Sequence, residues 1–552
     1  MKRLIVAASL LVSLGWTYAQ TSAPSAEEKD LMTWYHKDFS GSNVYGVNTE
    51  NAYKYLESKG LKPNKVVVGV LDSGVEVDHP GLVGNMWKNV NEIPGNGKDD
   101  DGNGYIDDVH GWNFIGGKNG DIDIDNLEVT RIVKKYQDVF SGDKAAENIK
   151  KMPQEYEMYS KSKSIFDKKS KGGGQQYKFY QNLLEKVPTF TAMLGDKPFT
   201  KETLAGIKPS SPDQAMGLQI MSQFLQDPTM VGKSAKEVEA VISKELLQGV
   251  KHFEAQAKQY DLNFDPRKEI VGDNYDDYSE KKYGNNHYEG PDAQHGTHVA
   301  GIIAGLPNGT EVQKGVAYKV AKILTVRTVP NGDERDKDVA NSIRYAVDNG
   351  AKILNMSFGK PVSPGMKYVW DAFKYAEDKG VLLVKAAGNE NEDIHDHVYY
   401  PTNFKSVEDE KPFLNNMIIV GASTNNNDAL RADFSNYNKK MVDVFAPGDK
   451  IYSTVPDGKY EYLQGTSMAA PVVAGASAVL LAYMPTLTPA QMIESLVKSS
   501  NPSSAAGFSN FSRSGGVIDV KKAAEYAYEN FYKNSASKSA STKATKLEKV
   551  KK

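Results

Sequence analysis

The chain has 552 residues, a formal net charge of −3 and no cysteine. This length is enough for a large hydrophobic core and for more than one domain. The lack of cysteine excludes disulfides, thiolate metal sites and a cysteine nucleophile, and the near-neutral charge gives no indication of nucleic-acid binding.

The first 19 residues have the pattern of a secretory signal peptide. Lys2 and Arg3 precede an apolar run over residues 4–16, and a cleavage site follows at residues 17–19. The apolar run is shorter than the about 20 residues that a membrane-spanning helix needs, and no later segment is long and apolar enough. We therefore expect an exported protein, secreted or periplasmic, without a membrane span.

Residues 20–59 predict an N-terminal arm that packs on the core, because aromatic residues and a helical pattern follow a polar start. The run of β-branched residues at 66–71 then predicts a parallel strand buried on both faces. Asp72 follows at the carboxyl end of this strand, where open α/β sheets place their functional groups. On its own, Asp72 could equally be a turn residue.

An acidic loop follows, with oxygen-bearing side chains at alternate positions and a glycine at the bend. This spacing matches the first half of a calcium-binding loop, although the twelfth position is a histidine and not the glutamate of an EF-hand. A solvated acidic turn is the alternative. The predicted ligands are the side chains of Asp99, Asp101, Asn103 and Asp107 and the carbonyl of Tyr105.

Residues 116–290 are rich in Lys, Glu, Gln and Tyr and have a mainly helical pattern. Ser211 and Ser234 each open a capping-box sequence, and apolar residues recur at helical spacing after Ser234. The glycines at 172–174 predict a break between two helices. Residues 273–286 predict a polar loop that returns to the main domain.

The remaining chain alternates between predicted strands and helices. We expect helices at 297–304 and 339–349 and strands at 322–328, 353–356 and 381–387. A run of small and apolar residues at 472–481 predicts a buried helix that begins near Ser467, with Pro471 in its first turn. A hydroxyl at a helix start can attack a carbonyl while a backbone N–H receives the oxyanion, although a helix-capping serine is commoner.

Three motifs together resemble those of the subtilisin-like serine peptidases. They are Asp-Ser-Gly at 72–74, His-Gly-Thr-His at 295–298 and Gly-Thr-Ser-Met-Ala-Ala-Pro at 465–471. The order Asp, His, Ser is that of subtilisin, and the three motifs in this order are highly specific. The resemblance implies an α/β fold with a doubly wound, mostly parallel sheet.

The resemblance also implies roles for individual residues. Ser467 would be the nucleophile, His295 the general base, Asp72 its orienting partner and Asn389 an oxyanion donor. A Tyr-Pro pair at 400–401 would place Tyr399 at the base of the main specificity pocket, which would favour small or medium side chains before the cut. The segments that would pair with an extended substrate are Ser357, Phe358, Gly359, Ala387 and Gly388. Family members often bind structural Ca²⁺, which supports the calcium interpretation of the acidic loop.

The family normally separates the Asp and His motifs by a few tens of residues. Residues 116–290 are therefore interpreted as a mainly α-helical insertion between two parts of the catalytic domain, 60–115 and 291–532. The insertion either restricts access to the active site or has no effect on catalysis. Residues 533–552 predict a disordered basic tail.

The predicted function is that of a secreted serine endopeptidase that hydrolyses proteins or peptides through an acyl-enzyme. Two alternatives remain open. One is an acyl transferase or ligase that uses the same site, and the other is a pseudopeptidase that binds proteins through the insertion. The sequence does not indicate the oligomeric state.

Overall fold

The computed structural model describes residues 24–309 and 311–533. The chain divides into two compact units, which we describe separately. The sheet unit contains residues 24–128 and 265–533, and the helical unit contains residues 129–264. The expected signal peptide at 1–19 and nearly all of the expected tail at 533–552 lie outside the described residues.

The sheet unit is built on one nine-stranded, mostly parallel sheet with the strand order β12-β13-β9-β8-β7-β6-β1-β5-β2. Six β-strands form the parallel centre, and their residues are almost all buried because helices cover both faces. Within this sheet, β12 and β13 pair in antiparallel fashion and the other neighbouring strands are parallel. The strands are β1 (Val66–Asp72), β2 (Gly111–Asn113), β5 (Ala321–Arg327), β6 (Ile353–Met356), β7 (Leu382–Ala386), β8 (Met417–Ser423), β9 (Val444–Pro447), β12 (Asn501–Pro502) and β13 (Gly516–Val517).

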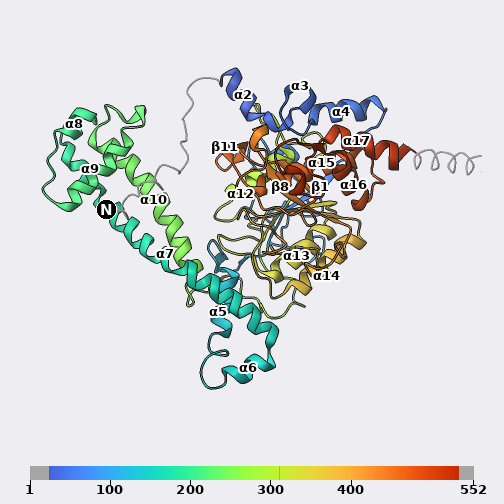
Figure 1. Cartoon of the computed structure of the whole chain (residues 1–552), viewed down its shortest axis with the longest axis horizontal. Helices are drawn as coiled ribbons and strands as arrows, with labels where there is room; N and C mark the ends of the chain where they lie inside the picture. Colours follow the sequence, from blue (N-terminus) through green and yellow to red (C-terminus); the bar gives the residue numbers. More distant parts are fainter. Residues whose placement is uncertain (1–23, 310, 534–552) are drawn as a thin grey trace, which may run out of the picture. The chain divides into compact units, whose positions relative to one another are not determined.

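Two hydrophobic clusters cover the two faces of this sheet. On one face lie α12 (Gln294–Ala304), α15 (Thr466–Tyr483), α16 (Pro489–Ser499), α17 (Val520–Ala527) and α4 (Thr49–Ser58) (Figure 1). On the other lie α13 (Asp336–Asp348) and α14 (Met366–Asp378). This is the predicted doubly wound arrangement.

Helix α15 runs through the middle of the first cluster. Among the described residues it alone is long and apolar enough to cross a membrane by length and composition, but 94% of it is buried inside the protein. Its helix begins at Thr466, so Ser467 lies in the first turn as expected. Pro471, expected in the first turn, instead lies inside the helix. The cap residue before the helix is Gly465, whose φ of 149° and ψ of 162° are readily adopted only by glycine.

Smaller elements complete the sheet unit. The N-terminal arm contains α2 (Ala26–Met32), α3 (Phe39–Ser42) and α4, and Trp34 donates from its indole Nε1 to the Lys450 carbonyl at 3.2 Å. Two hairpins are formed by β3 (Gly116–Gly117) with β4 (Gly120–Asp121) and by β10 (Ile451–Val455) with β11 (Lys459–Leu463). The short helix α11 spans Arg267–Ile270.

The helical unit has its own apolar core, formed where α7, α9 and α10 meet. Its helices are α5 (Glu128–Tyr136), which starts at the boundary, α6 (Ala145–Lys151), α7 (Pro153–Thr191), α8 (Lys201–Ala205), α9 (Pro212–Phe224) and α10 (Ala235–Gln259) (Figure 1). Ser234 forms the predicted capping box with Glu237. Ser211 caps α9, but the Gln214 side chain bonds to Ser210 and not to Ser211.

The predicted helix break at 172–174 is wrong, because α7 continues through all three glycines for 39 residues in total. Gly173 is buried, and a side chain there would lie 3.2 Å from the backbone nitrogen of Ala257 in α10. The glycine therefore allows α7 and α10 to approach closely, which outweighs its low helix propensity.

The helical unit, residues 129–264, covers fewer residues than the predicted insertion at 116–290. Residues 265–290 belong to the sheet unit, where buried ion pairs hold them in place. The Arg267 guanidinium donates to both Asp338 and Asp273 at 2.7–2.9 Å. Lys337 in α13 also bonds to Asp273, at 2.8 Å. The return loop is thus fixed to α13 by paired buried charges.

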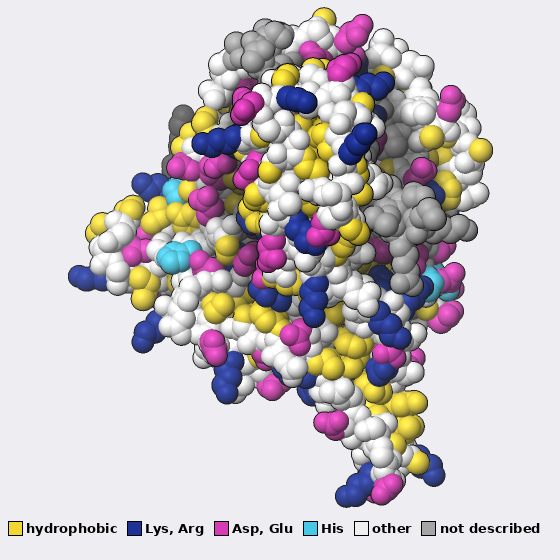
Figure 2. Space-filling view, turned by 90° about the vertical axis from the view of Figure 1, so that its left-hand side faces the viewer, with side chains coloured by type: hydrophobic (Ala, Val, Ile, Leu, Met, Phe, Trp, Pro, Cys, Tyr) yellow, Lys and Arg dark blue, Asp and Glu magenta, His cyan; other side chains and the backbone are white. Residues whose placement is uncertain are grey.

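Charges are mixed on the surface. On the described part of the face shown in Figure 2, basic and acidic side chains are interspersed, and no large area carries a single sign of charge. This agrees with the net charge of −3.

Candidate active site

Asp72 and His295 meet at the carboxyl end of the sheet. Asp72 is the last residue of β1. Helix α12 begins at Gln294, three residues before the predicted start at 297, so His295 lies in its first turn and not before the helix. His295 Nδ1 lies 2.6 Å from Asp72 Oδ1, and the same carboxylate oxygen accepts the Ser73 N–H at 2.7 Å. The structure thus brings together two predicted residues that are 223 positions apart.

The surroundings of this pair affect the protonation of the histidine. The Asp72 side chain is 3% exposed, whereas that of His295 is 39% exposed. Burial by itself would lower the pKa of His295, but the charge of Asp72 and the hydrogen bond to it raise that pKa above its ordinary value. The imidazolium form is therefore stabilised, as a general base requires once it has accepted a proton.

Ser467 lies in the first turn of α15, where backbone N–H groups are free of helical partners. It is the only residue of α15 that is not fully buried. Its Oγ donates to the Ser357 carbonyl at 3.1 Å, and the Ser357 hydroxyl donates to the Ser467 carbonyl at 2.9 Å. Ser357 follows β6 directly, so β6 and α15 meet at this serine pair.

Asn389 follows β7 and is held by Thr466. Its Oδ1 accepts the Thr466 N–H at 2.8 Å and the Thr466 hydroxyl at 3.0 Å. The Thr466 Oγ1 also accepts the Gly388 N–H at 3.1 Å. Because the amide oxygen is engaged in this way, the amide NH₂ of Asn389 remains as the donor for an incoming group. The Gly-Thr-Ser motif contained the signal for Thr466, but sequence reasoning gave this residue no role.

Both predicted substrate segments lie against Tyr399. A side chain at Gly359 would come 2.4 Å from the Tyr399 ring, and one at Gly388 would come 3.1 Å from it. The Lys385 ammonium lies 4.5 Å from the centre of the same ring, and burial lowers the pKa of Lys385 to about 7. Sequence reasoning did not single out Lys385, since a lysine within an apolar strand has no motif of its own. Phe358 and Ala387 complete the two segments, and both are buried.

Comparison with known proteins identifies the family of this chain. The family model of the subtilase family matches residues 63–517. The chain belongs to the subtilase family. Subtilases are serine-type endopeptidases, and the family match covers the Asp, His and Ser motifs together.

Individual relatives match shorter stretches of this subtilase. Thermitase of Thermoactinomyces vulgaris is 41% identical over 187 residues, which are 34% of this chain and 60% of thermitase. Subtilisin DY of Bacillus licheniformis is 36% identical over 232 residues, which are 42% of this chain and 77% of that protein. The solved structure of the prenylagaramide maturation protease PagA is 26% identical and aligns over 42% of this chain and 82% of that one, with a TM-score of 0.36.

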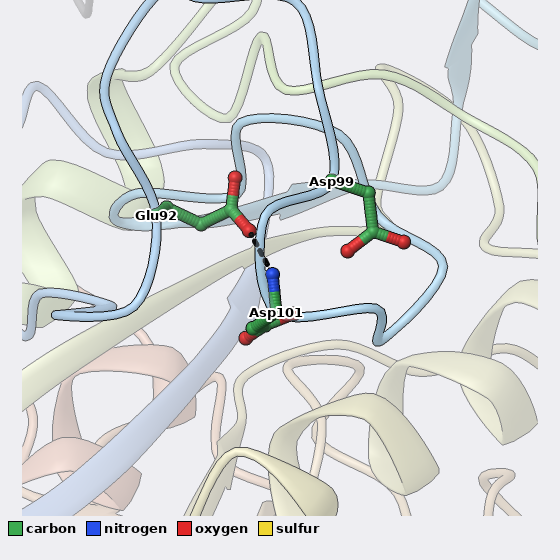
Figure 3. A group of neighbouring side chains, drawn as sticks. All are labelled: Glu92, Asp99 and Asp101. Atoms are coloured by element: carbon green, nitrogen blue, oxygen red, sulfur yellow. Dashed lines mark hydrogen bonds between the residues drawn. The ribbon is translucent and has the colours of Figure 1, made fainter.

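The acidic loop of this subtilase is organised around Glu92, which the sequence did not indicate. One carboxylate oxygen from each of Glu92, Asp99 and Asp101 lies within 4.8 Å of the other two (Figure 3). Glu92 also accepts the backbone N–H groups of Asp100, Asp101 and Asp107 at 3.0–3.3 Å. Its only signal in the sequence would have been an acidic residue shortly before the loop.

The other predicted ligands have different partners. The Asp107 carboxylate accepts the N–H groups of Asn96 and Gly97 at 3.2 and 2.8 Å. The Asn103 Oδ1 accepts the Tyr105 N–H at 2.7 Å, and the Lys282 ammonium bonds to the Asn103 carbonyl. In the described part of the chain, the carboxylates that lie close enough together to hold a cation are those of Glu92, Asp99 and Asp101, and Asp107 is not part of this group. Carboxylate oxygens so arranged suit Ca²⁺, a hard cation that binds oxygen ligands.

Proposed function

We propose that this subtilase is a serine endopeptidase in which Asp72, His295 and Ser467 form the catalytic triad. The observation that carries the proposal is the 2.6 Å hydrogen bond between His295 Nδ1 and Asp72 Oδ1. A bond at Nδ1 leaves Nε2 to act on the nucleophile, and the buried carboxylate favours the imidazolium. Ser467 is the only residue of α15 that is not buried, and its side chain is a hydroxyl.

The reaction proceeds in two halves. Ser467 Oγ attacks the scissile carbonyl while His295 takes its proton, and His295 then protonates the leaving amine. Water attacks the resulting acyl-enzyme in the second half. The Ser467 N–H and the Asn389 amide NH₂ would receive the negative charge that develops on the carbonyl oxygen. For Ser467 to react, its Oγ must exchange its bond to the Ser357 carbonyl for one to His295.

Labelling with a fluorophosphonate probe tests the nucleophile. The wild type should be labelled and should cleave peptides, whereas Ser467→Ala should do neither and should keep its melting temperature. Near-wild-type cleavage by Ser467→Ala would exclude the mechanism.

Analysing the products with and without an added amine separates hydrolysis from acyl transfer, because only a transferase would yield the amide of that amine as its main product.

We further propose that the acidic loop binds a structural Ca²⁺, with Glu92, Asp99 and Asp101 as the carboxylate ligands. A cation that binds only the folded state stabilises it by about 2.7 kcal/mol at a hundredfold excess over its Kd. Adding a chelator to calcium-loaded protein should therefore lower the melting temperature, and added Ca²⁺ should restore it. An identical melting curve with and without chelator would count against the site.

Specificity is proposed to depend on Tyr399, whose ring lies next to both Gly359 and Gly388. Its ring takes up space at the base of the pocket, so small or medium side chains should be preferred before the cut. Profiling on a peptide library tests this for the wild type and Tyr399→Gly. A strong preference for Phe or Tyr in both proteins would contradict it.

Export is proposed from the signal-peptide pattern at residues 1–19, which lies outside the described residues. N-terminal sequencing of the protein recovered outside the cytoplasm should begin near residue 20. Recovery of the intact N-terminus from the cytoplasm would contradict this proposal.

A further inference from the structure

The helix that carries the nucleophile contains a proline at an unusual position. Pro471 is inside α15, which begins at Thr466. A proline in a helix interior cannot donate to the carbonyl four residues earlier, and its ring crowds that carbonyl. Here the residue four positions earlier is Ser467 itself. The backbone carbonyl of the proposed nucleophile therefore lacks the helical donor that it would otherwise have.

The side chain of Ser357 supplies the missing donor. Its hydroxyl donates to the Ser467 carbonyl at 2.9 Å and is 2.9 Å from the Asn355 Nδ2, which donates to it. Asn355 is fully buried in β6, and Ser357 is 5% exposed. The donor that replaces the helical bond is thus fixed by a strand of the central sheet, and it is not a mobile surface group.

A second contact runs in the opposite direction. The Ser467 Oγ donates to the Ser357 carbonyl at 3.1 Å. Ser357 therefore contacts Ser467 twice, once at the backbone and once at the side chain. These two bonds connect the first turn of α15 to the end of β6.

We propose that Ser357 is a positioning residue. Its hydroxyl binds the Ser467 carbonyl and thereby orients the first turn of α15, because Pro471 has no N–H that could bind this carbonyl. The inference rests on the proposed function, in which the Ser467 N–H receives the oxyanion and its Oγ attacks. Both groups belong to the turn whose carbonyl Ser357 holds. Small displacements of such groups lower the rate strongly, since the reacting atoms must be aligned. The backbone carbonyl of Ser357 is not involved in this role, so substrate binding should be affected little.

The test compares Ser357→Ala in two backgrounds. With Pro471 present, Ser357→Ala should lower kcat about 10-fold, as expected for the loss of one hydrogen bond, with KM changed less than twofold. In the Pro471→Ala background, the restored N–H of residue 471 can donate to the Ser467 carbonyl. There, Ser357→Ala should lower kcat less than threefold. Rates are expressed per active site titrated with a fluorophosphonate, so that unfolded protein is not counted.

Ser477→Ala is the matched control. Ser477 is buried in the same helix, and its hydroxyl also donates to a helical carbonyl, that of Val473, at 2.8 Å. This variant loses a bond of the same kind away from the nucleophile, so its kcat should equal that of the wild type. A similar loss of kcat in Ser477→Ala would show that any weakening of α15 has this effect, and the proposal would be wrong.

Two further outcomes would overturn the proposal. One is a wild-type kcat in Ser357→Ala, and the other is an equal loss of kcat in both backgrounds. If Ser357→Ala does not fold, Ser357→Cys fills the same space with a weaker donor and allows the same comparison. Activity in Ser467→Ala would refute the proposed function, whereas an inactive Ser467→Ala beside a fully active Ser357→Ala would refute only the positioning role.

Discussion

The sheet unit and the helical unit bury their side chains in different ways. In the sheet unit, all five residues of β7 are buried, and in α15 every residue except Ser467 is buried. In the helical unit, α7 has 39 residues but buries only a few, spaced along one side. Burial on all sides fixes the backbone of the sheet unit, whereas the helical unit needs only an apolar stripe.

This difference indicates where chemistry can be placed. The proposed catalytic groups lie at the end of β1, shortly after β7 and in the first turns of α12 and α15, which belong to the buried sheet or pack on it. A site on such elements keeps its geometry better than a site on a solvent-exposed helix. The following predictions test whether activity depends on the sheet unit alone and whether each unit responds to substitution as its packing implies.

The largest expected effect is that of Asn389→Ala in the sheet unit. Removing the amide should lower kcat about 10²–10³-fold, which is the loss known for removal of an oxyanion-hole asparagine in subtilisin. The melting temperature should also fall, because Asn389 Oδ1 accepts the N–H and the hydroxyl of the buried Thr466, and the substitution leaves these donors without that acceptor. Steady-state kinetics on a short peptide measures this, and a loss smaller than threefold would exclude Asn389 from the oxyanion site.

In the helical unit, Leu246→Ala should lower the stability of that unit without changing the rate of catalysis. Leu246 is fully buried in α10, so its truncation should lower the free energy of unfolding of this unit by about 2–5 kcal/mol. Leu247→Ala is the matched control, because Leu247 is 44% exposed. Hydrogen exchange of α7 and α10 measures the stability, and kcat on a short peptide should stay within twofold of wild type. A tenfold fall in kcat for Leu246→Ala would show that the two units are coupled.

Acid should destabilise the sheet unit through two buried histidines. Burial lowers the pKa of both His36 and His298 to about 3, and a nearby positive charge, that of Lys314, adds to the effect at His36. Below their ordinary pKa of about 6.5, the unfolded state binds protons that the folded state does not, so stability should fall as the pH drops from 6.5 towards 3.

Urea unfolding at pH 7.5 and 5 measures this effect, provided that the wild type is compared with His36→Asn, which cannot titrate. The variant should show a smaller loss of stability between the two pH values. An equal loss in both proteins would mean that His36 does not contribute. His36 bonds to the Thr49 hydroxyl and the Lys314 carbonyl, so the variant will also be less stable at pH 7.5.

The smallest expected effects come from the glycines of α7. A side chain added at Gly172 or Gly174 would meet nothing within 4 Å, so Gly172→Ala and Gly174→Ala should stabilise the helical unit by about 0.5–1 kcal/mol. Gly173→Ala should stabilise it less or not at all, because its new side chain would meet α10 at 3.2 Å. Hydrogen exchange of α7 distinguishes the three variants, and equal stabilisation by all three would contradict the role of Gly173.

Much of the sheet unit could be predicted because its sequence carries strong local signals. The strand at 353–356 is found with the predicted bounds, and those at 322–328 and 381–387 differ by one residue at each end. The position of Pro471 was missed, because a local rule for prolines says nothing of a donor, here Ser357, from a distant strand.

Contacts between distant segments were harder to predict. Glu92 lies outside the acidic motif. It joins the group because backbone N–H groups of the acidic loop donate to its carboxylate. The Gly173 contact depends on α10, which begins more than sixty residues later. In both cases the contact is formed by a segment that tertiary structure brings near, so no local sequence pattern predicts it.

The bond between Thr130 and Gln259 has a consequence for folding. The Thr130 hydroxyl donates to the Gln259 carbonyl at 2.7 Å, so the two ends of the helical unit lie close together. Once this unit has formed, the chain between β1 and β5 behaves as a much shorter loop when Val66 pairs with Ala321. Loop-closure entropy rises by only about 0.6 kcal/mol for each doubling of loop length. A sheet of this kind can therefore accept a whole folded unit between its first two paired strands at a small entropic cost.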